Sequence, residues 1–157
     1  MSYSVILIRE KGADDRIASD AVSIFKKIPG PVQVSFSSQP VDLDIIGDGL
    51  LAREHTFSKI KEIRQQRGIS EDAFVLLLTS TPDEKNWYAA EDKENPRNGF
   101  GHVGDYSWVT TAPPSVIVAH YILNGLFTFL LGEKGITYAE VSHKEPRGCF
   151  YDLCPDK

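Results

Sequence analysis

The run Ala73–Thr79 (Ala-Phe-Val-Leu-Leu-Leu-Thr) constrains the fold more than any other part of the chain, because it is apolar almost throughout. A strand with one face in water alternates apolar and polar residues, whereas a strand covered on both faces is apolar at every position. We therefore expect Ala73–Thr79 to be a central strand of a sheet that has helices on both faces.

The beginning of the chain predicts a β-α-β unit. Tyr3–Ile8 and Val32–Phe36 are rich in β-branched and aromatic residues and are the predicted strands. Between them, apolar residues recur at helical spacing over residues 14–28, and Asp14 or Asp15 can cap the helix. A helical crossover of this kind joins parallel strands.

Two more helices are predicted, over residues 56–67 and 115–131. Thr56 can cap the first, and Gly68 ends it. The second is an apolar run of about sixteen residues, which is shorter than a membrane span, so we expect a buried helix and no membrane. The prediction is one α/β (α+β) domain over residues 1–157, with a mixed sheet of about four or five strands packed against helices.

Composition excludes some classes of function. Hydrophobic residues make up 41% of the chain and charged residues 25%, which is typical of a soluble globular protein. The formal net charge of −5 argues against a nucleic-acid partner, because such proteins need a basic face. The start of the chain has no basic segment followed by a long apolar run, so we expect a cytoplasmic protein.

The last third of the chain holds a candidate metal site. Two imidazoles and two thiols form a complete ligand set for tetrahedral zinc, and they would leave no open position for water. Such a zinc would be structural. The alternative is a hydrogen-bonded core histidine at position 120 and two small buried thiols. The candidate ligands are His120, His143, Cys149 and Cys154.

The window His120–Asn124 reads His-Tyr-Ile-Leu-Asn, and it belongs to a series of motifs that extends over residues 56–157. The others are Phe74–Thr79, Asn86-Trp87-Tyr88, Arg97–Phe100 and the segment from His143 to Gly148–Cys154. In their order and rough spacing these motifs resemble a degenerate archaemetzincin-like domain, from the zincin class of zinc metallopeptidases. The window His120–Asn124 corresponds to the His-Glu-x-x-His helix motif of zincins, with Tyr121 in place of the glutamate and Asn124 in place of the second histidine.

The resemblance implies a zincin-like fold and a pseudoenzyme. A tyrosine phenol, with a pKa near 10, does not accept a proton at neutral pH as a carboxylate does. The expected function is a non-catalytic module that binds a protein partner or assembles a bacterial multi-gene system, such as one for defence against phage. The alternative is a divergent zinc-dependent metallopeptidase or hydrolase whose base is Glu140, Glu145 or Asp152.

The long segment from Ser80 to Ser107 is rich in glycine, proline and aromatic residues. In zincins an edge strand near this point lines the substrate cleft. By analogy, Gly99–Val103 or Ser107–Thr111 could pair with an added peptide strand. The candidate peptide or partner surface comprises Asn98, Phe100, His102 and Trp108.

Overall fold

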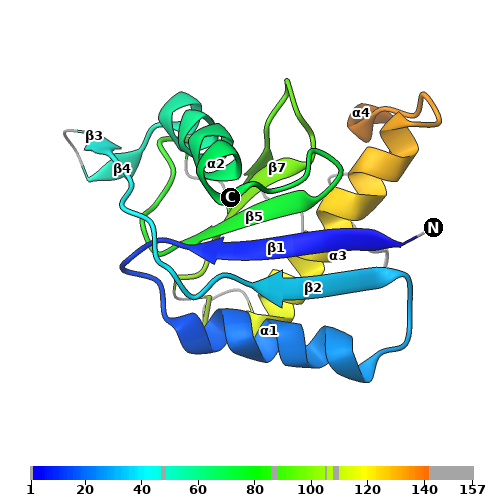
Figure 1. The fold of residues 1–157 in the computed structure, drawn as a ribbon, viewed down its shortest axis with the longest axis horizontal. Helices are drawn as coiled ribbons and strands as arrows, with labels where there is room; N and C mark the ends of the chain where they lie inside the picture. The colour runs from blue at the N-terminus through cyan, green and yellow to red at the C-terminus, as the bar shows by residue number, and fades with distance from the viewer. Residues whose placement is uncertain (1, 47–48, 86–87, 105, 108–109, 142–157) are drawn as a thin grey trace.

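The computed structural model describes residues 2–46, 49–85, 88–104, 106–107 and 110–141. The chain opens with a β-α-β unit, and two further groups of strands are then each followed or preceded by helices (Figure 1). The elements are β1 (Tyr3–Arg9), α1 (Asp15–Lys27), β2 (Val32–Phe36), β3 (Ile45–Ile46), β4 (Leu50–Leu51), α2 (Arg53–Arg67), β5 (Phe74–Thr79), β6 (Ala89–Glu91), β7 (Asn98–His102), α3 (Pro114–Gly132) and α4 (Tyr138–Val141).

Five strands form one mixed sheet in the order β2-β1-β5-β7-β6. Strands β1, β2, β5 and β7 are parallel, and the edge strand β6 runs antiparallel to β7. The short strands β3 and β4 form a separate antiparallel pair. This confirms the expected class, an α+β fold with a mixed sheet packed against helices.

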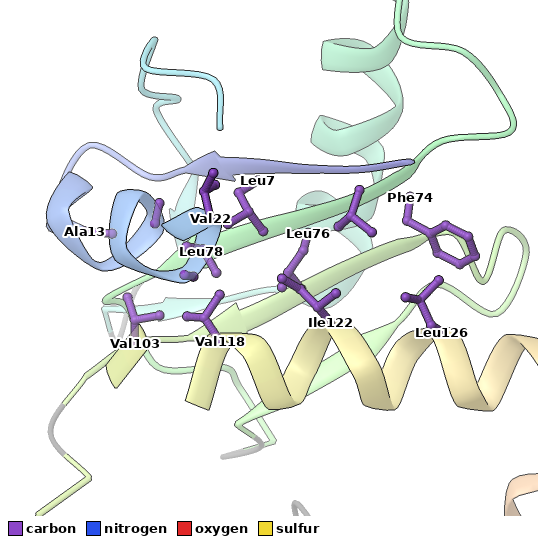
Figure 2. Packing of buried hydrophobic residues seen from close by; sticks show 13 residues of the cluster. Leu7, Ala13, Val22, Phe74, Leu76, Leu78, Val103, Val118, Ile122 and Leu126 are labelled. Atoms are coloured by element: carbon purple, nitrogen blue, oxygen red, sulfur yellow. The ribbon is translucent and has the colours of Figure 1, made fainter. Parts of the chain in front are cut away.

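Helices cover the two faces of the central strand β5, whose residues are all buried. On one face, Leu76 and Leu78 pack in a cluster with residues of α1 and α3 (Figure 2). On the other face, Val75 and Leu77 pack against α2. The prediction of a central strand covered on both sides is therefore confirmed.

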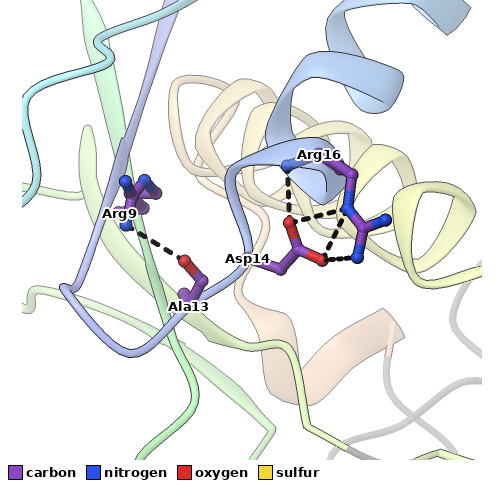
Figure 3. A network of polar contacts seen from close by, with 4 residues as sticks. All are labelled: Arg9, Ala13, Asp14 and Arg16. Atoms are coloured by element: carbon purple, nitrogen blue, oxygen red, sulfur yellow. Dashed lines mark hydrogen bonds and ion pairs between the residues drawn. The ribbon is translucent and has the colours of Figure 1, made fainter.

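The start of α1 follows the capping pattern that the sequence predicts. Asp14 is the N-cap residue, and its carboxylate accepts a hydrogen bond from the Arg16 backbone N–H at 2.9 Å (Figure 3). The Arg9 guanidinium donates to the Ala13 carbonyl oxygen at 3.1 Å. The end of β1 and the start of α1 are thus joined by side-chain hydrogen bonds as well as by the chain.

Helix α2 begins three residues before the expected cap at Thr56. Thr56 is buried inside the helix, and its hydroxyl donates to the Ala52 carbonyl oxygen. The Glu84 carboxylate accepts from the Arg53 backbone N–H at 3.3 Å, and the Arg53 guanidinium pairs with buried Asp83. The predicted capping role of Thr56 is therefore taken by Glu84, which comes from a loop distant in the sequence.

Helix α3 is longer than the sequence predicted. It has 19 residues, and by length and composition it could cross a membrane. In this fold it lies on the face of the sheet that α1 also covers, where Val118, Ile122 and Leu126 are buried. Helix length therefore does not argue against a membrane span, and packing on the sheet accounts for only the buried part of the apolar residues of α3.

Candidate functional site

Tyr121, at the position where the expected zincin-like motif would have glutamate, lies with its ring against β7. A Cβ atom built on Gly101 would lie only 2.7 Å from Cδ2 of the Tyr121 ring. Real Cβ atoms do not approach so closely, so glycine at position 101 allows the ring to lie directly on the strand. The ring fills the space between α3 and the sheet.

The Tyr121 hydroxyl is part of a buried hydrogen-bond network. Its oxygen lies 2.6 Å from the Tyr106 hydroxyl oxygen, and both hydroxyls are within reach of the His102 carbonyl oxygen. Burial raises the pKa of Tyr121 and of Tyr106 far above the ordinary value. Tyr121 therefore stays a neutral phenol and cannot take a proton from water at neutral pH.

His120 is half-buried beside Tyr121, with 6.5 Å between the ring centroids. Burial lowers the pKa of His120 below its ordinary value, which favours the neutral imidazole that a metal ion requires. The other three candidate ligands, His143, Cys149 and Cys154, lie outside the described residues. Within the described residues, no group of three or more His, Cys, Asp or Glu side chains is positioned to hold a metal.

Two further polar atoms on α3 are buried one and two turns after His120. Neither Asn124 Oδ1 nor Thr128 Oγ1 has a hydrogen-bond partner in the described part of the protein. Residues four apart in a helix lie on the same side, so both follow His120 along α3. Buried polar atoms nearly always have partners. This side of α3 is thus suited to contact a polar group.

The structure also reveals a half-buried carboxyl that sequence reasoning missed. Glu91 lies on the edge strand β6, and its Oε1 is 3.7 Å from the position that a Cβ on Gly125 of α3 would take. Burial raises the pKa of Glu91 above its ordinary value. Glu91 lies beside α3 because β6 pairs with β7, and no local pattern of residues predicts that pairing.

Glu140, one of the three candidate bases, has a structural role in the described part of the chain. Its carboxylate accepts from the Thr137 backbone N–H and hydroxyl, both at 2.7 Å, at the start of α4. These hydrogen bonds lower the pKa of Glu140. The bond from the Thr137 N–H to Glu140 is the half of a capping box that the acidic residue supplies, so the carboxylate is engaged at the start of the helix. Glu145 and Asp152 lie outside the described residues.

The predicted peptide or partner surface is not formed by its first two residues. Asn98 and Phe100 have exposed fractions of 0% and 1%, and they are packed between the sheet and α2. Asn98 Oδ1 accepts from Arg64 Nε at 2.5 Å, and the ring of Phe100 lies 5.8 Å from that of Phe57. Both side chains belong to the interior because they point to the face of the sheet that α2 covers.

The two strands proposed for peptide addition also differ from the prediction. Gly99–Val103 overlaps β7 (Asn98–His102), which is paired on both sides and has no open edge. The described residues of Ser107–Thr111 are not in a strand. The His102 ring is held locally, with Nε2 at 3.0 Å from the Ser80 carbonyl oxygen and Nδ1 accepting from the Gly104 N–H. Trp108 lies outside the described residues.

An apolar surface instead runs along the outside of α3. Val116, Phe127 and Leu130 are 45%, 49% and 37% exposed, and Leu123 between them is half-buried. Their spacing of seven, four and three residues places them on one side of the helix. We call these four residues the outer stripe of α3.

Comparison of the chain with protein-family models, with curated proteins and with solved structures finds no match. The function of this protein is therefore inferred from its own residues and their geometry.

Proposed function

We propose that this protein is a non-catalytic zincin-like module that binds a protein partner. The observation that carries the proposal is Tyr121. A zinc peptidase needs a base at this position to take the proton of the metal-bound water. The neutral, hydrogen-bonded phenol of Tyr121 cannot serve as that base. The helix that would hold a catalytic motif in a zincin then acts here as a structural and binding element.

The outer stripe of α3 supports the partner-binding part of the proposal. Apolar residues with helical spacing on an exposed helix face are the usual contact for a partner helix or groove. Phe127 is the natural anchor, because aromatic residues dominate the binding energy of protein interfaces. On this view the module is a cytoplasmic assembly component of a bacterial multi-gene system, with phage defence as the candidate setting.

A structural zinc is the proposed cofactor. The neutral imidazole of His120 fits a zinc ligand, and two imidazoles with two thiolates complete a tetrahedral site without a position for water. When bound, zinc would supply a cross-link between distant parts of the chain. The segment carrying His143, Cys149 and Cys154 would be tied to α3.

The second candidate function is a divergent zinc-dependent hydrolase, and Glu91 is the observation that favours it. A carboxyl whose pKa is raised by burial is the usual state of a general acid or base. Glu91 lies on the edge strand β6, with its carboxyl next to Gly125 of α3, and Gly125 is one helical turn after Tyr121. This candidate requires a metal and a water within reach of that carboxyl.

The proposed function is tested with three tagged variants expressed at native level in the source cells. Phe127→Ser and Leu130→Ser change the outer stripe, and Ile28→Ser is the matched control because Ile28 is an exposed apolar residue outside α3. We expect in-cell cross-linking to recover the same partner with the wild type and Ile28→Ser, and to lose it with both α3 variants. Equal recovery with all three variants would refute the outer stripe as the partner surface.

A further inference from the structure

The outer edge of β2 is an open strand edge. Ser37 donates its backbone N–H to the Leu7 carbonyl oxygen of β1, and the Pro31 carbonyl oxygen accepts from Tyr3. Backbone groups alternate in direction along a strand, so the N–H and C=O groups of Val32, Val34 and Phe36 face away from β1. In the described part of the protein, no strand pairs with this edge.

The β2 edge also lacks the features that normally prevent strands from pairing. Its sequence, Val-Gln-Val-Ser-Phe, contains no charged residue, proline or glycine. Natural edge strands usually carry such residues, or are covered, because an open edge is a template for another strand. Figure 1 shows β2 at the border of the sheet, with α1 running alongside it. The edge is thus suited to pair with a second strand.

A groove of about 420 Å³ runs between α1 and β2. The half-buried side chains of Val34 and Phe36 form its apolar wall, and Lys26 from the last turn of α1 adds a positive charge. A strand added to β2 would place side chains over this groove. The residues that line the groove are Ser19, Val22, Ser23, Lys26, Val34, Ser35 and Phe36.

The exposed side of α1 next to the groove carries a self-complementary charge pattern. Asp15, Ser19, Ser23 and Lys26 are exposed and recur at helical spacing. The acid lies at the beginning of this row, the base lies at its end, and the two residues between them are small. Two copies of the row that run antiparallel would therefore place each Lys26 near an Asp15.

We propose that two copies of this chain pair through β2 in antiparallel orientation, about a two-fold axis at Val34. Val34 of each copy would exchange backbone hydrogen bonds with the other, and Val32 would do so with Phe36 of the second copy. The two sheets would join into one, and the two α1 helices would lie side by side. A two-fold interface of this kind uses the same surface twice.

The charge pattern favours a second copy over other occupants of the groove. An acidic peptide would satisfy Lys26 but would meet repulsion at Asp15. A second copy places opposite charges at both ends of the row, and does so twice because of the symmetry. The contact is partly electrostatic, so its affinity should fall as the salt concentration rises.

Charge reversal tests the orientation of the helices by sedimentation equilibrium of the full chain. We expect the wild type to dimerise, and Lys26→Glu and Asp15→Lys each to weaken the dimer by about tenfold, because each substitution creates two repulsive contacts. The double variant should recover most of the affinity. A wild type that is monomeric at all concentrations, or a dimer that neither single variant weakens, would overturn the proposal.

Disulfide trapping tests the register. An axis at Val34 places Gln33 opposite Ser35 of the second copy as a non-hydrogen-bonded pair, with Cα atoms about 4.5 Å apart, which suits a disulfide. Mixing Gln33→Cys with Ser35→Cys should give a cross-linked dimer under mild oxidation, above the background of the wild type with its native cysteines. Each variant alone should stay at background.

Two trapping results would contradict this pairing. Efficient cross-linking of Gln33→Cys with itself, or no cross-link in the mixture, would exclude this register. A monomeric chain that binds an added peptide of alternating valine and glutamate would assign the groove to a peptide and overturn the dimer.

Discussion

Replacing Tyr121 with glutamate restores the missing residue of the zincin motif, and we expect it to destabilise the protein rather than to create a peptidase. The Tyr121 ring is packed on Gly101 between α3 and β7. Truncation of a buried aromatic side chain to alanine costs about 3–5 kcal/mol. The glutamate methylene groups recover part of this contact, so we expect a loss of about 2–4 kcal/mol from packing.

The charge of the new carboxyl adds a pH-dependent loss. The glutamate side chain is shorter than that of tyrosine, so its carboxyl would lie in the space that the Tyr121 ring now fills against Gly101, short of the Tyr106 hydroxyl and the His102 carbonyl oxygen. Burial raises the folded-state pKa of such a carboxyl above its unfolded value. Stability is then greatest below the unfolded pKa, and it falls as the pH rises through the folded pKa.

The assay is urea unfolding at pH 5 and pH 8 of the wild type, Tyr121→Glu, Tyr121→Gln and Tyr121→Phe. Tyr121→Gln has the size of the glutamate without its charge, so it should show the packing loss alone at both pH values. Tyr121→Phe should lose only about 0.5–1.5 kcal/mol, for one hydrogen bond. Tyr121→Glu should fall below Tyr121→Gln at pH 8. Equal stability of Tyr121→Glu and the wild type at pH 8 would show that the site is open to water and would refute this reasoning.

Three further predictions concern other parts of the structure. Glu91→Gln should be more stable than the wild type at pH 7, and this difference in stability should disappear near pH 4. The raised pKa of Glu91 makes its ionised form unfavourable in the folded state. Urea unfolding across this pH range measures the difference. Protein prepared without chelator should contain about one zinc per chain by mass spectrometry of metals, and Cys149→Ser should lose it; a metal-free wild type that stays folded would exclude the site. Arg64→Ala should lower the free energy of unfolding in urea by about 3–5 kcal/mol, because the buried guanidinium donates to Asn98 and to three carbonyl oxygens. The control Arg67→Ala should lower it by about 1 kcal/mol. Equal losses in the two variants would contradict this prediction.

The fold was predictable where burial leaves a local signature in the sequence. The unbroken apolar run of β5 reflects cover on both faces, and Asp14 caps α1 through a hydrogen bond to a residue two positions away. Strand β6 has no such signature. It is three residues long, and its place at the sheet edge is set by pairing with β7.

The sequence shows which residue types the candidate site contains, but it does not show which residues they contact in the fold. The sequence identifies tyrosine at position 121, but the hydroxyl of Tyr106 that binds it comes from a different segment. Asn98 was expected on a partner surface by analogy with the edge strand of zincins, yet its side chain lies in the interior, where Arg64 of α2, 34 positions away, donates to its Oδ1. Contacts of this kind depend on the tertiary fold and cannot be read from local sequence.

The central proposal, that this chain is a non-catalytic module and not a peptidase, is tested most directly by a peptide-hydrolysis assay. The zinc-supplemented wild type and Glu91→Gln should be incubated with a fluorogenic peptide library, with chelator-treated wild type as the blank. We predict that both proteins stay at the rate of the blank. Zinc-dependent cleavage by the wild type that is lost in Glu91→Gln, while that variant remains folded, would contradict the account and identify Glu91 as the catalytic base.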